Sequence, residues 1–189
     1  MTGEDEMYYA LHVGCGNETK VEESILHVLP EGSYSGCFHV IRNRQKKIHG
    51  EWEDSFDYLI PGYVFLITDD IETAYTGMRK VLFYKRILGR ERHDGGSFFV
   101  PLPPEEEAWI EVVTGDTACR MGAVYTDPSF IEFDEYDRVR VIDGPLKNLT
   151  GLVKRIDRHK RIAEVTVPFM GDDRSLYLGI EFLEKKETP

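Results

Sequence analysis

Residues 138–182 consist of short runs in which polar and apolar residues alternate, and a turn signal separates each run from the next. Alternation has the two-residue period of a half-buried β-strand, so this part of the chain is poorly suited to helices. The turn signals are rich in glycine, proline and aspartate, as at Gly144-Pro145 and Gly171-Asp172. Four or five such strands in about 50 residues predict a small all-β barrel.

Residues 7–114 have a different texture, because extended apolar runs alternate with stretches of helical spacing. Val21, Ile25 and Leu29 illustrate one helical stripe, which Pro30 ends. Strands are expected at residues 8–13, 38–48, 52–56, 63–67, 83–88 and 98–100, and helices at residues 17–29, 71–82 and 103–113. The mixture predicts an α+β domain, in which helices pack against an antiparallel sheet.

The stretch between these two parts is expected to be a linker. Residues 115–131 are polar and contain Gly115, Gly122 and Pro128, and the stretch is longer than most connections inside a domain. The predicted organisation is therefore a first domain at residues 7–114, a linker at residues 115–131 and a β-barrel domain at residues 132–185.

Charge is unevenly distributed along the chain. The formal net charge is -11, which argues against a protein that coats DNA non-specifically. Most of the excess acid lies before residue 132, whereas residues 147–161 hold six lysines and arginines against a single acid, Asp157. Because attraction to nucleic acid depends on local charge, a small RNA or DNA footprint is compatible with the acidic total. A solvated basic face without a partner is the alternative.

The three cysteines lie far apart and form no Cys-x-x-Cys pair. This spacing excludes a disulfide framework and a zinc finger, and it fits a reducing cytosol. No apolar stretch approaches the ~20 residues that a membrane-spanning helix needs, and residues 1–7 lack the features of a secretory signal. The sequence contains no nucleophile-and-base set, metal-ligand spacing or phosphate-binding loop, so we predict a protein that is not an enzyme and needs no cofactor or metal.

The segment from Asp137 to Gly151 closely resembles a KOW motif, in which Gly144 and Gly151 flank a loop. Gly144 is expected to adopt a positive φ, and Gly151 to allow a tight start of the next strand. The earlier runs Tyr8–Val13 and Pro61–Phe65 resemble the amino-terminal (NGN) domain of the NusG family. The resemblance covers residues 8–184 and implies an NGN antiparallel sheet with flanking helices, followed by a small SH3-like barrel.

Within that family, Lys154–Ala163 is similar to a stretch typical of LoaP proteins, which are bacterial NusG paralogues that promote processive antitermination. The resemblance implies a monomeric, cytoplasmic bacterial factor without membrane attachment. Its implied partners are RNA polymerase for the NGN domain and a stem-loop of nascent RNA for the KOW domain. Basic side chains with few aromatics suit the phosphates and groove shape of duplex RNA better than stacking on single strands. The implied RNA-binding residues are Lys147, Lys154, Arg155, Arg158, His159, Lys160 and Arg161.

Members of this family dock a concave apolar surface of the NGN sheet on the clamp coiled coil of RNA polymerase. Matching positions imply Tyr8, His12, Tyr63 and Phe65 for that surface. Alternation places Tyr63 and Phe65 on one face of a strand, so both are expected to be surface residues or both core residues. The resemblance predicts that Phe65→Ala keeps the fold and weakens polymerase binding.

A basic hairpin is implied to lie near upstream or non-template DNA through Arg42, Arg44, Lys46 and Lys47, and a solvated hairpin that contacts nothing is the alternative. Two other functions stay open. The chain could be a general elongation and termination factor whose KOW barrel binds ribosomal or termination proteins. A KOW motif is also compatible with a ribosome-associated protein.

Overall fold

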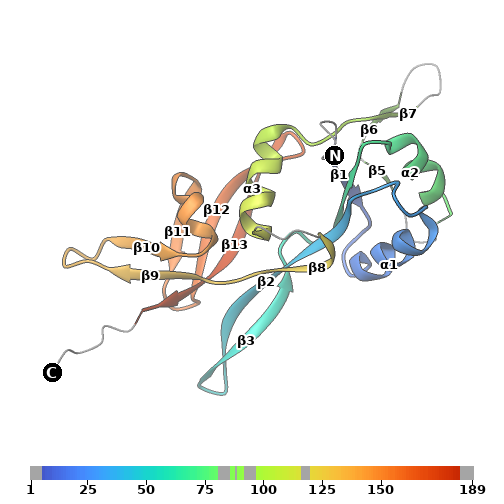
Figure 1. The fold of residues 1–189 in the computed structure, drawn as a ribbon. Coiled ribbons are helices and arrows are strands. Elements are labelled where there is room, and N and C mark those ends of the chain that lie inside the picture. The colour runs from blue at the N-terminus through green and yellow to red at the C-terminus, as the bar shows by residue number, and fades with distance from the viewer. Residues whose placement is uncertain (1–5, 81–85, 88, 92–96, 116–119, 184–189) are drawn as a thin grey trace. The chain divides into compact units, whose positions relative to one another are not determined.

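The computed structural model describes residues 6–80, 86–87, 89–91, 97–115 and 120–183 (Figure 1). The chain divides into two compact units. The first unit comprises residues 1–40, 60–107 and 116–124, and the second comprises residues 41–59, 108–115 and 125–189. The predicted α+β class, with a sheet-and-helix part followed by an all-β part, is confirmed.

The sheet that begins in the first unit is antiparallel in the strand pairs β1–β4, β1–β5, β2–β3 and β2–β4. The strand order is β3-β2-β4-β1-β5, and β8 also pairs with β2. Its strands are β1 (Met7–His12), β2 (Gly36–Ile48), β3 (Glu51–Tyr58), β4 (Tyr63–Thr68), β5 (Arg86–Ile87) and β8 (Met121–Thr126). Residues 41–48 of β2 and all of β3 fall in the second unit. A separate pair is formed by β6 (Gly89–Glu91) and β7 (Ser97–Phe99).

Two helices cover one face of this sheet. The helices are α1 (Glu18–Val28) and α2 (Ile71–Met78). They bury Val21, Ile25 and Met78 against strand residues such as Leu11 and Leu66. Because successive side chains of a strand point to opposite faces, every second side chain of β1, β2 and β4 points away from the two helices. The third helix, α3 (Pro104–Thr114), begins with proline and three glutamates, as expected from the preference for carboxylates at a helix start.

The two helix starts on this face are made differently. Asp70 accepts a hydrogen bond from the Thr73 backbone N–H at 3.0 Å, which is an N-cap of α2. Asn17, which precedes the first residue of α1, makes no capping bond, and its side-chain amide instead donates to the Val13 carbonyl at 3.2 Å. The start of α1 is held by the next residue, Glu18.

Glu18 ties α1 to the turn that precedes β4. Its side chain is fully buried, and Oε1 accepts a hydrogen bond from the backbone N–H of Gly62 at 2.6 Å. Gly62 is itself buried and has φ +89°, so it is the turn residue that the Pro61-Gly62 pair predicts. A single buried carboxylate therefore satisfies a buried donor and fixes the turn against the helix.

We expect Glu18→Ala to lower the free energy of unfolding by about 1–3 kcal/mol, because it leaves the Gly62 N–H buried without an acceptor. Urea denaturation followed by circular dichroism measures this loss. Glu23→Ala, on the exposed side of the same helix, is the matched control and should change stability by less than about 0.5 kcal/mol. Equal effects of the two changes would contradict the proposed role of Glu18.

The second unit contains a five-stranded sheet with the order β10-β9-β13-β12-β11. Four neighbouring pairs form it, of which β9–β13 is parallel and the others are antiparallel. Its strands are β9 (Ser129–Phe133), β10 (Val139–Asp143), β11 (Val153–Asp157), β12 (Ile162–Phe169) and β13 (Asp172–Phe182). Val165 on β12 lies opposite Leu176 on β13 and both are buried, so the alternating apolar residues form the inner face. The five strands confirm the all-β prediction for this region.

The loop between β10 and β11 contains two short 3-10 helices, Pro145–Asn148 and Thr150–Leu152. Gly144 has φ +90°, which confirms the expected positive φ. Gly151 does not have a positive φ, and an added Cβ there would meet no atom within 4 Å. The expected special role of Gly151 at the start of the next strand is therefore wrong.

The predicted linker at residues 115–131 is also corrected, because two strands occupy much of it. β8 pairs with β2, and β9 belongs to the five-stranded sheet. Val124, Thr126 and Ser129 are buried, and this burial explains why a polar stretch with two glycines is extended and paired. The strand expected at residues 83–88 falls partly outside the described residues.

Candidate nucleic-acid interface

The basic segment predicted from the sequence folds as β11, a four-residue turn and the start of β12. A β-bulge interrupts the pairing of β11 with β12 between Val153 and Arg155. Val153 and Ile156 lie opposite the buried residues Val165 and Ala163, so two residues, Lys154 and Arg155, separate the inward-facing positions. Regular alternation would have turned one of these two cations inward, whereas the bulge leaves both exposed.

The turn at residues 158–161 adds further exposed basic groups. Arg158 is held in place, because its Nη2 lies 2.7 Å from the Asp137 carboxylate and its guanidinium carbon lies 3.6 Å from the ring centroid of Phe133. His159 and Lys160 are exposed, and the backbone N–H of Lys160 donates to Asp157 at 3.0 Å, which shapes the turn. We call the exposed set Lys154, Arg155, Arg158, His159 and Lys160 the β11 cation cluster.

Two predicted RNA-binding residues do not join this cluster. Arg161 is half-buried, donates a hydrogen bond to the side-chain amide oxygen of Gln45, and stacks 4.1 Å from the ring centroid of Trp52. The Arg161 guanidinium is therefore occupied by contacts within the second unit. Lys147 is exposed but lies in the 3-10 helix before β11, at the opposite end of that strand from the turn.

The aromatic residues expected to bind polymerase are mostly covered. Phe65 is 0% exposed and Tyr8 is 6% exposed. Phe38 joins them, with ring centroids 5.4 Å from Phe65 and 6.5 Å from Tyr8. Their strands direct these rings to the sheet face opposite α1 and α2, but that face is packed at this point. The expected exposure of Tyr8 and Phe65 is therefore wrong.

Tyr63 and His12 differ from their neighbours on the same face. Both are half-buried, and their ring centroids lie 5.2 Å apart. They stand opposite each other at the end of the β1–β4 ladder. The prediction that Tyr63 and Phe65 share one environment is wrong, because burial changes along the strand even though the face does not.

The cations of the β2–β3 hairpin converge on one carboxylate, Asp57. Its Oδ2 lies 2.8 Å from Arg44 Nε, 3.3 Å from Lys46 Nζ and 3.7 Å from Arg42 Nη2. Partial burial opposes ionisation of Asp57, but hydrogen bonds from Arg44 and Lys46 hold its pKa below the usual range. Burial also lowers the pKa of Arg42, which donates to the Tyr177 carbonyl at 2.8 Å. Only Lys47 of the four predicted DNA-contact residues is exposed.

Sequence reasoning missed the residues that organise the cluster. Asp137 and Phe133, which hold Arg158, lie more than 20 residues before it and carry no local signal. Glu164 and Tyr177 face outward next to Arg155 and could have been found, because the alternation in β12 and β13 places them on the exposed face. No residue type in β11 is specific to β-bulges, so the bulge could not be predicted from the sequence.

In the described ranges, no three or more His, Cys, Asp and Glu side chains are placed to hold a metal ion. Burial raises the pKa of the Cys37 thiol, and Glu22 adds to the effect, so this thiol stays protonated. The described helices are too short or too polar to span a bilayer.

The comparisons with known proteins agree over nearly the whole chain. Residues 137–167 match the KOW motif. The chain is similar to the transcription termination/antitermination protein NusG of Thermus thermophilus and of Bacillus subtilis, at 27% identity in each case. The matches cover 94% and 96% of this chain, and 97% and 99% of the two relatives. NusG of Borreliella burgdorferi is 21% identical over 94% of this chain and 97% of its own length. A solved structure describing domain interaction in Thermotoga maritima NusG matches 93% of this chain and 94% of its own, with 19% identity and a TM-score of 0.46.

Proposed function

The chain belongs to the NusG family, and we propose that it is a LoaP-like antitermination factor that binds RNA polymerase and a nascent RNA stem-loop. The β11 cation cluster is the observation that carries the RNA part of this proposal. Within the described residues, no side chain forms an ion pair with Lys154, Arg155 or Lys160. Their charge is therefore available to phosphates, whereas the hairpin cations already share Asp57.

The shape of the cluster favours a duplex. Lys154 and Arg155 lie at the bulge, and Arg158 and Lys160 lie in the turn that ends the same strand. Lys154 and Arg158 are four residues apart along an extended strand, which is about 13 Å, so the two groups can reach phosphates on both sides of an A-form minor groove. The Phe133 ring is covered by Arg158 and offers little face for stacking by a single-stranded base.

The polymerase-binding part of the proposal rests on the half-buried pair Tyr63 and His12. These two rings are half-buried at the end of β1 and β4, while Tyr8 and Phe65 are buried further along the same two strands. Aromatic side chains at the edge of a well-packed surface make good anchors for a partner helix. Lys47 is the hairpin residue that we propose for DNA contact, because its side chain is exposed.

Salt dependence tests the RNA interface directly. Lys154→Gln combined with Arg155→Gln should reduce the slope of log affinity against log salt concentration by about 1–2, because two phosphate contacts are lost. The measurement is fluorescence anisotropy of a labelled RNA stem-loop titrated with the full chain at several salt concentrations.

The control is Arg138→Gln combined with Arg140→Gln, which changes net charge equally on β10 and its preceding turn. Arg138 and Arg140 are already paired with Asp134 and Glu132, so this variant should keep the wild-type slope. An unchanged slope in the Lys154 and Arg155 variant would contradict RNA binding by the cluster. It would favour a general NusG factor whose KOW domain binds proteins.

A further inference from the structure

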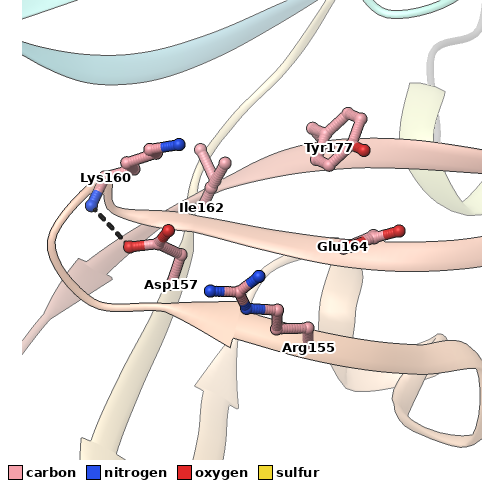
Figure 2. A pocket seen from close by; sticks show the side chains of 6 residues that line it. All are labelled: Arg155, Asp157, Lys160, Ile162, Glu164 and Tyr177. Atoms are coloured by element: carbon pink, nitrogen blue, oxygen red, sulfur yellow. Dashed lines mark hydrogen bonds between the residues drawn. The ribbon is translucent and has the colours of Figure 1, made fainter.

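The outer face of β11, β12 and β13 holds a cleft that shares Arg155 and Lys160 with the β11 cation cluster. Its volume is about 180 Å³, and it is lined by Arg155, Asp157, Lys160, Ile162, Glu164 and Tyr177 (Figure 2). Drug-sized ligands usually occupy at least ~300 Å³, so this cleft suits a smaller, single planar group. The three strands and the turn bring together two cations, two carboxylates and one aromatic ring.

The two carboxylates are the unexpected feature of this cleft. Asp157 and Glu164 are half-buried among cations that would otherwise suit phosphates. A carboxylate repels a phosphate, so a surface that reads only the RNA backbone gains nothing from either group. Arg155 lies directly opposite Glu164 in the strand register, yet among the described residues neither Arg155 nor Lys160 forms an ion pair with a carboxylate.

Both carboxylates are positioned by hydrogen bonds that leave acceptor capacity. Glu164 Oε1 accepts from the Ser175 hydroxyl at 2.9 Å, and Asp157 Oδ1 accepts from the Lys160 backbone N–H at 3.0 Å. An ionised carboxylate has about four acceptor sites, so each of these groups can accept from a ligand. The cleft therefore offers positioned acceptors beside two exposed cationic donors.

Guanine is the RNA base whose edges match this arrangement. Its N1–H and N2–H groups are adjacent donors that a carboxylate can accept together, and its O6 and N7 atoms are acceptors for arginine or lysine. Adenine, cytosine and uracil each lack the adjacent pair of donors. Tyr177, which is 40% exposed, supplies a ring on which a base can stack.

We propose that this cleft binds one unpaired guanine, extruded from the RNA stem-loop that the β11 cation cluster holds. The inference rests on the proposed RNA-binding function and adds sequence selectivity to it. Glu164 accepts from the Watson–Crick edge, Arg155 donates to the O6 and N7 edge, and Tyr177 stacks on the base. The guanine has to be unpaired, because base pairing would occupy the edge that Glu164 reads.

The experiment compares stem-loops that are identical except for one bulged nucleotide, which is G, A, C or U. Anisotropy titrations with the full chain should show about tenfold tighter binding of the G bulge, the size of effect typical of one bidentate base contact. Glu164→Gln should abolish this preference while binding of the A, C and U bulges changes little. Tyr177→Leu, which keeps an apolar side chain without a ring, should weaken all four complexes and the G complex most.

Two variants serve as controls for the change in charge and the loss of a ring. Glu132→Gln removes one carboxylate from β9, and Tyr136→Leu removes an exposed ring from the turn before β10. Both should retain the preference for G. Nuclear magnetic resonance titration with guanosine 5′-monophosphate, with ribose 5-phosphate as the phosphate control, should shift signals of Glu164 and Tyr177 only for the nucleotide.

The outcomes separate the two proposals. If all four bulges bind equally well and the nucleotide shifts no cleft signals, the guanine site is wrong and the RNA interface stands. If no stem-loop binds at physiological salt, the proposed function is wrong and the guanine site falls with it. A preference for G that survives Glu164→Gln would also overturn the assignment.

Discussion

Replacing Phe65 with alanine is expected to lower the free energy of unfolding by about 3–5 kcal/mol, the usual cost of deleting a buried ring. Phe65 is fully buried, lies opposite Ala10 and Phe38 in the strand register, and contacts the Phe38 ring. Alanine leaves a cavity between these neighbours. Because a domain is typically stable by only 5–15 kcal/mol, this loss should produce a clearly lower urea midpoint by circular dichroism.

The matched control is Phe56→Ala. Phe56 is 55% exposed and makes an edge-to-face contact with Tyr125, so its removal should cost less than about 1.5 kcal/mol. Polymerase binding should be measured only under conditions in which each variant is folded. If Phe65→Ala unfolds at the wild-type urea concentration and loses polymerase binding, the ring is a surface anchor and its burial in the fold is contradicted.

The difference between Phe65 and Tyr63 shows what a sequence pattern cannot predict about burial. Alternation along β4 correctly assigns the two residues to one face of the sheet. It does not say what covers that face, because coverage depends on residues from β2 and other parts of the chain. The helical stripe Val21, Ile25 and Leu29 predicts burial more directly, because an apolar stripe on one side of a helix normally faces the protein core.

The basic segment shows a similar limit. Six cations between residues 147 and 161 are visible in the sequence, but their spatial grouping depends on the fold. The bulge in β11 keeps Lys154 and Arg155 exposed together, whereas Arg161 turns to Gln45 and Trp52. These partners lie more than 100 residues away in sequence, so no local pattern could have removed Arg161 from the predicted site. Strand and turn positions, which depend on local residues, were mostly predictable.

Gly144→Ala is the second change with a large expected effect, and it acts on the second unit. Gly144 has φ +90° and ψ 179°, a conformation that is essentially restricted to glycine. A Cβ at this position would lie 2.6 Å from Ser129 Cα and 3.0 Å from Ser129 Cβ. The neighbour is backbone at the start of β9, so a flexible side chain cannot move aside to relieve the clash.

Relief of that clash would also break a buried hydrogen bond. The Leu146 N–H donates to the Ser129 hydroxyl at 3.0 Å, and both residues are fully buried. Backbone strain costs about 1–3 kcal/mol and overpacking about 1–3 kcal/mol, so the expected loss is about 2–6 kcal/mol. In a β-sheet unit with a modest core, this loss should unfold a measurable fraction at 37 °C, seen as missing dispersed amide signals for β9–β13.

Gly151→Ala is the matched control, seven residues later in the same loop. Its Cβ meets no atom within 4 Å, and its backbone does not have a positive φ. Removing a glycine at such a site restricts the unfolded chain and stabilises a protein by about 0.4–1 kcal/mol. The two glycines of the motif should therefore shift the thermal midpoint in opposite directions. Equal losses from both changes would mean that the loop tolerates neither side chain, and that the contact with Ser129 is not what makes Gly144 necessary.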